Sequence, residues 1–309
     1  MKVIDLINSS KSTAFSFEIL PPLKGNSIQK VYNVIDKLIE FDPKYINITS
    51  HHSEYIYKTL PDGSFQKINI RKRPGSVAIA SAIQNKYGIT AVPHIICKGF
   101  TKDETEYALI DLNFLGVYDL LLLRGDVKTL EAGQKTDIYH EHATDLQKQV
   151  NDFNKGIAID GSAFEANETP FSYGMACYPE KHEEAPNMES DIFYLKEKVK
   201  NGADYLVTQM FFDNEKYYAF VDRCRAEGIT VPIIPGIKPI VFKNQLTVLP
   251  KIFRSDIPEP FATELRKCKT DDEAKAVGVE WCIQQCKDLI AHGVPSLHFY
   301  TMMASDSVY

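Results

Sequence analysis

Short apolar runs alternate along the chain with longer amphipathic stretches. The run FSFEIL at 15–20 is the first, and an apolar stripe at helical spacing follows it over 27–41. This pair of patterns recurs along the whole chain, as far as the last apolar run at 297–302. We therefore expect eight strands, at 15–20, 45–50, 90–97, 119–126, 171–179, 205–213, 232–240 and 297–302. Helices are expected between them, at 27–41, 75–87, 102–115, 142–154, 188–201, 214–227, 243–253, 258–267 and 271–292.

The alternation of strands and helices predicts the fold class. When each strand is followed by a helix, the helix serves as a crossover connection and neighbouring strands run parallel. Eight such units in 309 residues favour a single α/β domain, a (β/α)8 TIM barrel over residues 1–309, with a doubly wound sheet as the alternative. No GxGxxG follows the first strand, so a Rossmann nucleotide site is not predicted. Long loops are expected at 51–74, 127–141 and 156–170, the last as a hairpin or a lid.

Composition and charge narrow the classes of function. The chain is 44% hydrophobic with a net charge of -6, which argues against a duplex nucleic acid as partner. No run approaches the roughly 20 apolar residues of a membrane helix, so no membrane association is expected. The six cysteines form no CxxC pair, which favours reduced thiols and a cytoplasmic location. The first strand carries no HxH and the chain no HExxH, so no metal site is expected.

Polar residues stand where the expected strands end. In a barrel the carboxyl ends of the strands form the active site, so side chains from distant parts of the sequence meet there. Every expected strand contributes at least one. They are Glu18, Thr49, His51, His52, His94, Arg124, Asp126, Tyr178, Glu180, His182, Gln209, Asp213, Lys238, His298 and Tyr300.

Glu18 poses the sharpest question, because a carboxylate inside a short apolar strand is costly to bury. Chemistry alone leaves two interpretations open, a buried ion pair with a nearby Arg or Lys and a catalytic acid. Apolar surroundings would raise its pKa, as a general acid near neutral pH requires. His94 is similarly open between a core histidine and a ligand-binding one. Arg124, Gly125 and Asp126 are open between a turn that satisfies its own charges and a binding site.

Seven motifs in order carry a resemblance to a known family. They are FSFEILPP, PHIICKGFT, LLLLRGD, ACYPEKH, GADYLVTQMFFD, IIPGIKPI and LHFYTM. Together they resemble methylenetetrahydrofolate reductases, flavoenzymes of one-carbon metabolism, over about residues 12–303. The resemblance implies a barrel that holds FAD without a Rossmann domain, and a homo-oligomer. It also implies the catalytic barrel alone, without the eukaryotic domain that binds S-adenosylmethionine.

The resemblance further implies a ping-pong reaction. NADH or NADPH reduces the flavin and leaves, and methylenetetrahydrofolate then accepts hydride to give 5-methyltetrahydrofolate. Glu18 matches the general acid that opens the folate ring to an iminium cation. Asp126 matches the carboxylate that stabilises this cation and tunes the flavin. Gln209 matches a glutamine that contacts both folate and nicotinamide.

The remaining site residues are also carried over from the resemblance. Cofactor contacts fall on Thr49, which matches a threonine near the nicotinamide, and on the FAD positions Ser50, His52, His94, Arg124, Gly125, Asp126, Ala143, Tyr178, His182, Asp191 and Lys198. Substrate contacts fall on Glu18, Asp126, Gln209, Gln245 and Tyr300.

Two departures from the family pattern leave alternatives open. The segment after Thr49 reads SHHSEY instead of the YGA usual in bacterial relatives, and Ala304 stands where a folate-binding arginine is expected. Lys238 is a candidate for the missing charge. The alternative functions are a flavin-free lyase or pterin-binding transferase that uses Glu18 and Asp126, and a folate- or flavin-binding module without turnover.

Overall fold

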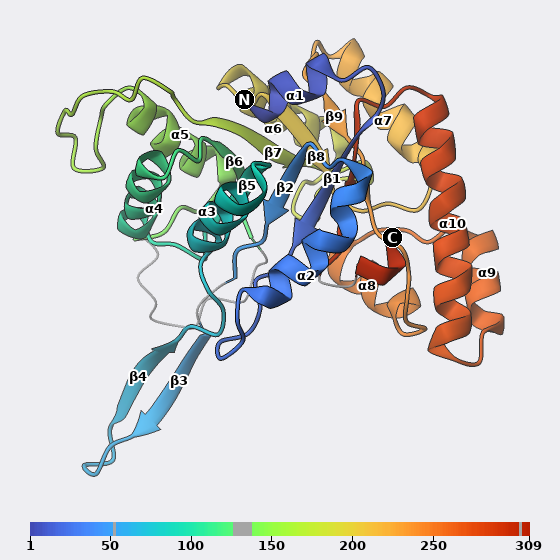
Figure 1. Cartoon of the computed structure of the whole chain (residues 1–309), viewed down its shortest axis with the longest axis horizontal. Coiled ribbons are helices and arrows are strands. Elements are labelled where there is room, and N and C mark those ends of the chain that lie inside the picture. The colour runs from blue at the N-terminus through green and yellow to red at the C-terminus, as the bar shows by residue number, and fades with distance from the viewer. Residues whose placement is uncertain (52–53, 126–137, 303–304) are drawn as a thin grey trace.

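Parallel strands form a closed barrel in the computed structural model, which describes residues 1–51, 54–125, 138–302 and 305–309 (Figure 1). In the described residues the sheet runs in the order β10-β11-β1-β2-β5-β6-β7-β8-β9. These strands are β1 (Ala14–Ile19), β2 (Tyr45–Ile48), β5 (Thr90–Ile96), β6 (Asp119–Leu123), β7 (Ser172–Cys177), β8 (Tyr205–Thr208), β9 (Ile233–Ile234), β10 (Gly236–Ile237) and β11 (Ser296–Phe299).

The barrel closes at Pro235. This one residue separates β9 from β10, and β9 pairs with β8 while β10 pairs with β11. The two segments are therefore one barrel strand with a neighbour on each side. Counted this way, the described part of the chain contains the eight expected strands, and the expected TIM barrel is confirmed.

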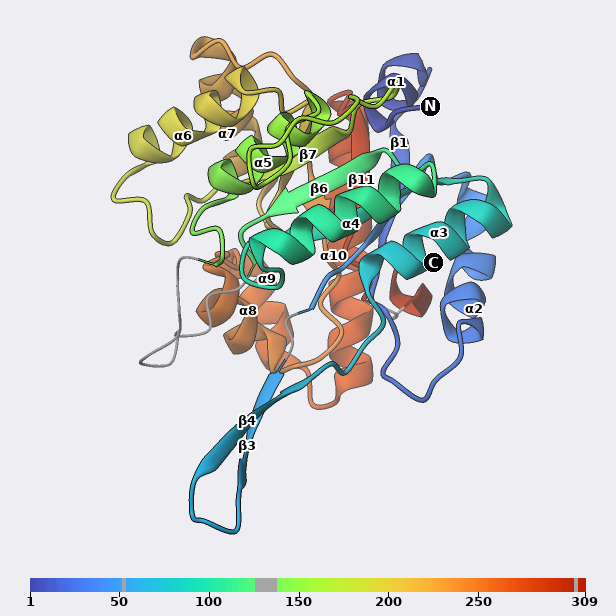
Figure 2. The ribbon, with the colours of Figure 1, turned by 90° about the vertical axis from the view of Figure 1, so that its left-hand side faces the viewer.

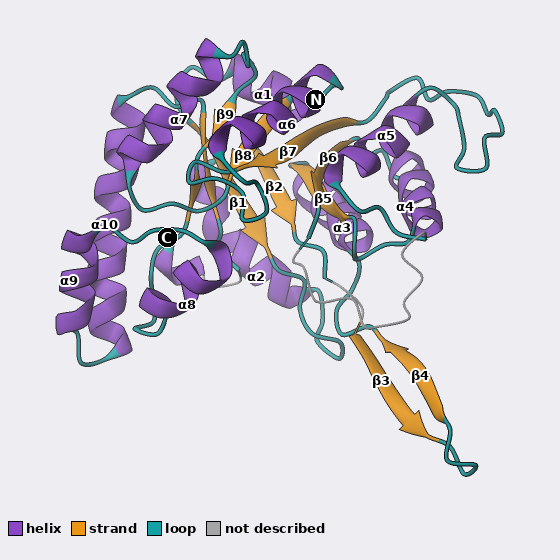
Figure 3. Cartoon of the chain, turned by 180° about the vertical axis from the view of Figure 1, so that it is seen from behind, coloured by secondary structure: helices purple, strands orange, loops and turns teal. Residues whose placement is uncertain are grey.

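Helices surround the barrel at nearly the expected positions (Figure 3). They are α2 (Gln29–Leu38), α3 (Ser76–Tyr87), α4 (Lys102–Phe114), α5 (Ala143–Asn154), α6 (Met188–Lys200), α7 (Asn214–Ala226), α8 (Gln245–Phe253), α9 (Glu259–Lys267) and α10 (Asp271–Ala291), with 3-10 turns at Ile39–Phe41 and Ser305–Ser307. Among the described residues, no helix is both long and apolar enough to span a membrane.

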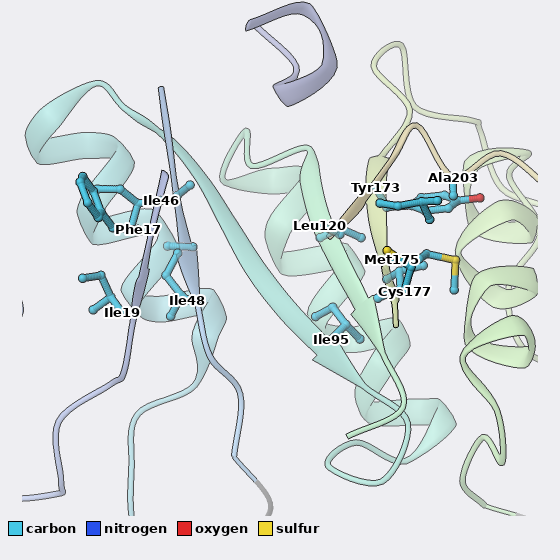
Figure 4. Packing of buried hydrophobic residues seen from close by; sticks show 14 of the residues in the cluster. Phe17, Ile19, Ile46, Ile48, Ile95, Leu120, Tyr173, Met175, Cys177 and Ala203 are labelled. Atoms are coloured by element: carbon cyan, nitrogen blue, oxygen red, sulfur yellow. The ribbon is translucent and has the colours of Figure 1, made fainter. Parts of the chain in front are cut away.

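Alternation along β1 sends its side chains to two different environments. Phe17 and Ile19 point outward and pack beside Ile46 and Ile48 of β2 in the core between strands and helices (Figure 4). A strand has a period of two, so Glu18 faces the barrel interior. The apolar residues next to Glu18 in the sequence therefore line the opposite face of the sheet.

A short helix that the sequence did not predict, α1 (Val3–Ser9), packs against the barrel interior. Val3 and Ile7 are buried in a cluster with inward-facing Tyr45 and with residues of other strands. The Val3 amide donates to Asp119 Oδ1 at 2.8 Å, at the first residue of β6. Because α1 meets the start of this strand, it covers the end of the barrel opposite to Glu18. Burial of the Asp119 carboxyl group at this end raises its pKa to about 6.

Two of the expected loops contain strand structure. The prediction of a loop over 51–74 is wrong, because this segment holds an antiparallel hairpin of β3 (Glu54–Thr59) and β4 (Phe65–Ile70). The hairpin projects from the barrel (Figure 2). The segment 156–170 carries one antiparallel bridge, between Ile157 and Ala163, and so turns back on itself like a short hairpin. Most of the third segment, 127–141, lies outside the described residues.

Candidate active site

Glu18 lies at the centre of a buried cluster built by three strands. Its side chain projects inward from β1, where the residue is only 6% exposed. His94 of β5 and His298 of β11 each place Nε2 at 3.8 Å from Glu18 Oε2. Neither Nε2 atom has a hydrogen-bond partner among the described residues, although both are buried. Two imidazoles thus face one carboxylate oxygen, just beyond hydrogen-bond distance.

The expectation of a raised Glu18 pKa is wrong for this arrangement. Burial raises the pKa, but the contact with His298 and the electrostatic effects of His94, His298 and Lys238 together lower it by more. The net pKa therefore lies below the ordinary value for a glutamate. Glu18 is an ionised carboxylate at neutral pH, and it must gain a proton before it can act as an acid.

The two histidines differ in their surroundings. Burial lowers the pKa of His94 to about 4, against a smaller opposing effect of Glu18, so His94 is neutral at pH 7. His298 Nδ1 shares a hydrogen bond of 2.8 Å with Ser16 Oγ. When the Ser16 hydroxyl is the donor, the His298 proton sits on Nε2 and points toward Glu18.

Sequence reasoning placed His298 at a strand end but gave it no role. The signal was present in the topology, since closing the barrel pairs the first strand with the last. In the observed register Ser16 lies opposite His298, and a period of two puts Glu18 on the same face as Ser16.

Tyr300 and Lys238 extend the cluster. The Tyr300 ring meets the His298 ring edge-on, with centroids 5.0 Å apart, and its hydroxyl donates to the Thr208 carbonyl at 2.6 Å. Lys238 Nζ donates to the Tyr300 carbonyl at 3.4 Å. Burial lowers the pKa of Lys238, and the nearby Glu18 partly opposes this. The Lys238 cation thus lies close enough to the Glu18 carboxylate for each to shift the pKa of the other.

Three further expected site residues, two for the cofactor and one for the substrate, directly follow barrel strands. Thr49 comes directly after β2, is buried, and its amide donates to the Ile19 carbonyl at 3.0 Å. Ser50 follows it and is half-buried. Gln209 comes directly after β8, with its amide donating to the Cys177 carbonyl at 2.9 Å.

Gln245 has a local structural role that sequence reasoning did not foresee. It is the first residue of α8, and its Oε1 accepts from the Val241 amide at 2.7 Å and from the Phe242 amide at 3.0 Å. Its side-chain oxygen therefore stabilises the turn that leads into this helix.

Arg124 and Gly125 follow β6. Arg124 forms an ion pair with Glu184, and its Nε is buried without a hydrogen-bond partner in the described part of the chain. An orphaned guanidinium nitrogen is costly unless a ligand satisfies it. Gly125 has φ of +80°, a conformation that favours glycine.

A second group of expected FAD residues joins the end of β7 to α6. The Tyr178 and His182 rings meet edge-on at 4.7 Å, and the His182 amide donates to Asp191 Oδ2 at 2.8 Å. Burial lowers the pKa of His182. It also lowers the pKa of Lys198, whose Nζ donates to the Ala176 carbonyl at 2.9 Å.

These groups suit the diphosphate of a dinucleotide such as FAD. Arg124 offers an unsatisfied donor and Lys198 a second cation, and α5 begins at Ala143 with the positive end of a helix dipole. Three expected positions, His52, Asp126 and Ala304, lie outside the described residues. Within the described ranges, no three His, Cys, Asp or Glu side chains gather closely enough to hold a metal ion.

Fold and site together define a (β/α)8-barrel protein with an acid–base cluster at the carboxyl ends of its strands. The chain belongs to the methylenetetrahydrofolate reductase family, because the model of that family matches residues 2–309. The family resemblance noted from the sequence motifs is thereby confirmed.

Curated relatives of bacterial and eukaryotic origin are similar over nearly the whole chain. The 5,10-methylenetetrahydrofolate reductase of Escherichia coli is 30% identical over 95% of this chain and 88% of its own. A probable methylenetetrahydrofolate reductase (NADPH) of Caenorhabditis elegans is 30% identical over 99% of this chain. Methylenetetrahydrofolate reductase (NADH) 1 of Arabidopsis thaliana is also 30% identical over 99%. This chain spans 42% and 49% of the lengths of these two, about half of each eukaryotic relative.

Solved structures support the fold alone. A Clostridium thermocellum protein that binds two copies of 5-methyl-5,6,7,8-tetrahydrofolic acid superposes with a TM-score of 0.54 at 14% identity, over 98% of this chain and 96% of that one. An oxaloacetate acetylhydrolase superposes with a TM-score of 0.53 at 11% identity, over 99% of this chain and 81% of that one.

Proposed function

We propose that this protein reduces 5,10-methylenetetrahydrofolate to 5-methyltetrahydrofolate, with NADH or NADPH as reductant and FAD as cofactor. The observation that carries the proposal is the buried Glu18 between His94 and His298, at the carboxyl end of the barrel of a chain in this family. The names of the bacterial and eukaryotic relatives support the same substrate and a nicotinamide reductant.

Glu18 is the proposed general acid. Reduction of the methylene bridge requires its five-membered ring to open, and a proton on the departing nitrogen makes that opening easier. Glu18 is ionised without substrate, so it must be protonated during the cycle. In this proposal a doubly protonated His298 ring gives the Nε2 proton to Glu18 and returns to its neutral form; the 3.8 Å separation from Glu18 Oε2 and the hydrogen bond of Nδ1 with Ser16 support this role.

FAD, when bound, would supply the hydride chemistry that links the two substrates. In the proposed ping-pong order the nicotinamide leaves before the folate enters. Arg124 and Lys198 would hold the diphosphate through charge-assisted hydrogen bonds, and the paired rings of Tyr178 and His182 would contact the same cofactor. Gln209 would orient each substrate in turn, and Tyr300 would support the wall beside His298. The role of Asp126 as a charge near the reacting atoms rests on the sequence motif.

One experiment tests the proposal. Purified protein, supplied with FAD, is mixed without air with NADH or NADPH and then with methylenetetrahydrofolate. We expect a yellow protein that bleaches with the reductant, regains its colour with the folate, and yields 5-methyltetrahydrofolate. The relative bleaching rates identify the preferred nicotinamide.

Two outcomes would contradict the proposal. Protein that binds no FAD would favour the flavin-free lyase or transferase. Protein that bleaches but is not reoxidised by the folate would favour a binding module without turnover.

A further inference from the structure

The hydrogen bond between Ser16 and His298 belongs to a longer series of polar groups inside the barrel. In the register of β1 with its two neighbours, Ser16 lies opposite His298 of β11 on one side and opposite Tyr45 of β2 on the other. Residues that lie opposite each other in paired strands share one face of the sheet. Their chain neighbours Phe17 and Ile46 point outward, away from the barrel interior (Figure 4). Ser16, Tyr45 and His298 therefore lie side by side in the interior.

Tyr45 extends this series to a fourth side chain. Its hydroxyl lies 3.3 Å from Ser296 Oγ, two residues before His298 on β11. Burial raises the pKa of Tyr45, and side-chain hydrogen bonds with Ser16 and Ser296 oppose this effect. The Tyr45 hydroxyl therefore joins serine hydroxyl groups from two neighbouring strands.

The series is closed to solvent. Ser16, Tyr45, Ser296 and His298 are each 0% exposed. Tyr45 packs in a cluster of hydrophobic residues from α1 and several other barrel strands. A hydroxyl proton buried in such surroundings is costly unless an acceptor takes it. The direction in which each hydroxyl donates is thus set by its neighbours in the series.

The direction of the series depends on the protonation of His298. When the neutral ring carries its proton on Nε2, the Ser16 hydroxyl donates to Nδ1 and accepts from Tyr45. When the ring is doubly protonated, Nδ1 also carries a proton and becomes a donor. Ser16 must then accept from Nδ1 and donate to Tyr45, which in turn donates to Ser296. The series thus offers a satisfied arrangement for both forms of the ring.

We propose that Tyr45 is a positioning residue for the proton of the folate half-reaction, because it allows Ser16 to accept from a doubly protonated His298. This inference rests on the proposed function. In the proton transfer the Nε2–H bond of His298 breaks, an O–H bond forms on Glu18, and the neutral ring keeps its proton on Nδ1. Glu18 passes the proton to the departing nitrogen of the folate, and solvent water returns one proton to the ring in each turnover. Without the Tyr45 hydroxyl, the Ser16 proton is unpaired whenever His298 is doubly protonated.

Stopped-flow absorbance of FAD-loaded Tyr45→Phe tests this role, because the variant keeps the aromatic ring and removes only the hydroxyl. Flavin reduction by NADH or NADPH should stay within about twofold of the wild type. Reoxidation by methylenetetrahydrofolate should slow by about 5- to 100-fold, the range that corresponds to one unpaired buried hydroxyl. Ser296→Ala, which removes the far end of the series, should slow the same half-reaction. Undiminished reoxidation in either variant, or equal slowing of both half-reactions, would overturn the proposal.

Tyr205→Phe is the matched control. Tyr205 is as deeply buried as Tyr45, the two ring centroids are 6.4 Å apart, and the Tyr205 hydroxyl has no hydrogen-bond partner among the described residues. This variant removes a hydroxyl from the same part of the barrel without interrupting the series. Both half-reactions should therefore keep their wild-type rates. A slowing of reoxidation as large as that of Tyr45→Phe would assign the effect to packing and overturn the proposal.

A spectroscopic measurement separates this proposal from the proposed function. Nitrogen-15 NMR of histidine-labelled protein reports which ring nitrogens of His298 carry a proton, with the signal assigned by its loss in His298→Gln. At about pH 6, the fraction protonated on Nδ1 should be smaller in Tyr45→Phe than in the wild type, and unchanged in Tyr205→Phe. Equal fractions in the wild type and Tyr45→Phe would overturn the role of Tyr45 even in an active reductase. A protein without reductase activity would refute the proposed function, and the NMR comparison would still test the hydrogen-bonded series.

Discussion

His94 makes a defined contribution to acid unfolding. It is 3% exposed, and burial lowers its pKa to about 4 from 6.5. The unfolded chain therefore binds a proton at this residue at higher pH than the folded chain does. Stability from neutral His94 is complete above pH 6.5 and is lost as pH falls toward 4. The shift corresponds to a loss of about 3 kcal/mol in the free energy of unfolding.

Urea unfolding from pH 7.5 to 4 measures this loss, with Trp281 as the probe. Trp281 is the single tryptophan of the sequence, and its ring stacks on that of Phe261 with the ring centroids 4.5 Å apart. His94→Gln keeps a similar shape but does not titrate. Its free energy of unfolding should fall less than that of the wild type across this range, by about 3 kcal/mol. Equal losses in the two proteins would refute the buried neutral histidine.

Three further perturbations test other parts of the structure. Gly278→Ala in α10 should lower the free energy of unfolding by about 1–3 kcal/mol in thermal melts, because its Cβ would lie 1.9 Å from the Ile240 carbonyl oxygen; a stabilised variant would contradict this packing. Lys238→Met removes a charge that lowers the Glu18 pKa. The rate of the folate half-reaction should therefore fall at higher pH than in the wild type, and an unchanged pH profile would exclude this effect of Lys238 on Glu18. Arg124→Gln should weaken FAD binding by about 10- to 150-fold in fluorescence titrations, and unchanged affinity would exclude a phosphate contact.

The barrel was predictable because each of its strands and helices has a recognisable hydrophobic pattern in the local sequence. Apolar runs such as 15–20 and 205–213, each followed by a helical stripe, are enough to expect parallel strands with crossovers. The hairpin was missed because apolar and charged residues occur on both of its faces, as with Ile56 beside Tyr57 and Lys58. The seven-residue helix α1 is too short for its periodicity to be distinctive.

The environment of Glu18 depends on contacts that the local sequence does not contain. Its chain neighbours Phe17 and Ile19 suggested apolar surroundings, but they face the helices. The groups that govern its pKa come from β5, β11 and the end of β10, as many as 280 residues away along the chain. The position of Glu18 at the strand end could thus be predicted, while the direction of its pKa shift could not.

The central claim is that Glu18 supplies the proton for the folate half-reaction alone. Stopped-flow absorbance of the FAD-loaded Glu18→Gln variant tests it most directly, with each half-reaction followed separately. Flavin reduction by NADH or NADPH should stay within about threefold of the wild type, while reoxidation by methylenetetrahydrofolate should slow by about 100-fold or more. Equal slowing of both half-reactions, or undiminished reoxidation, would contradict the account.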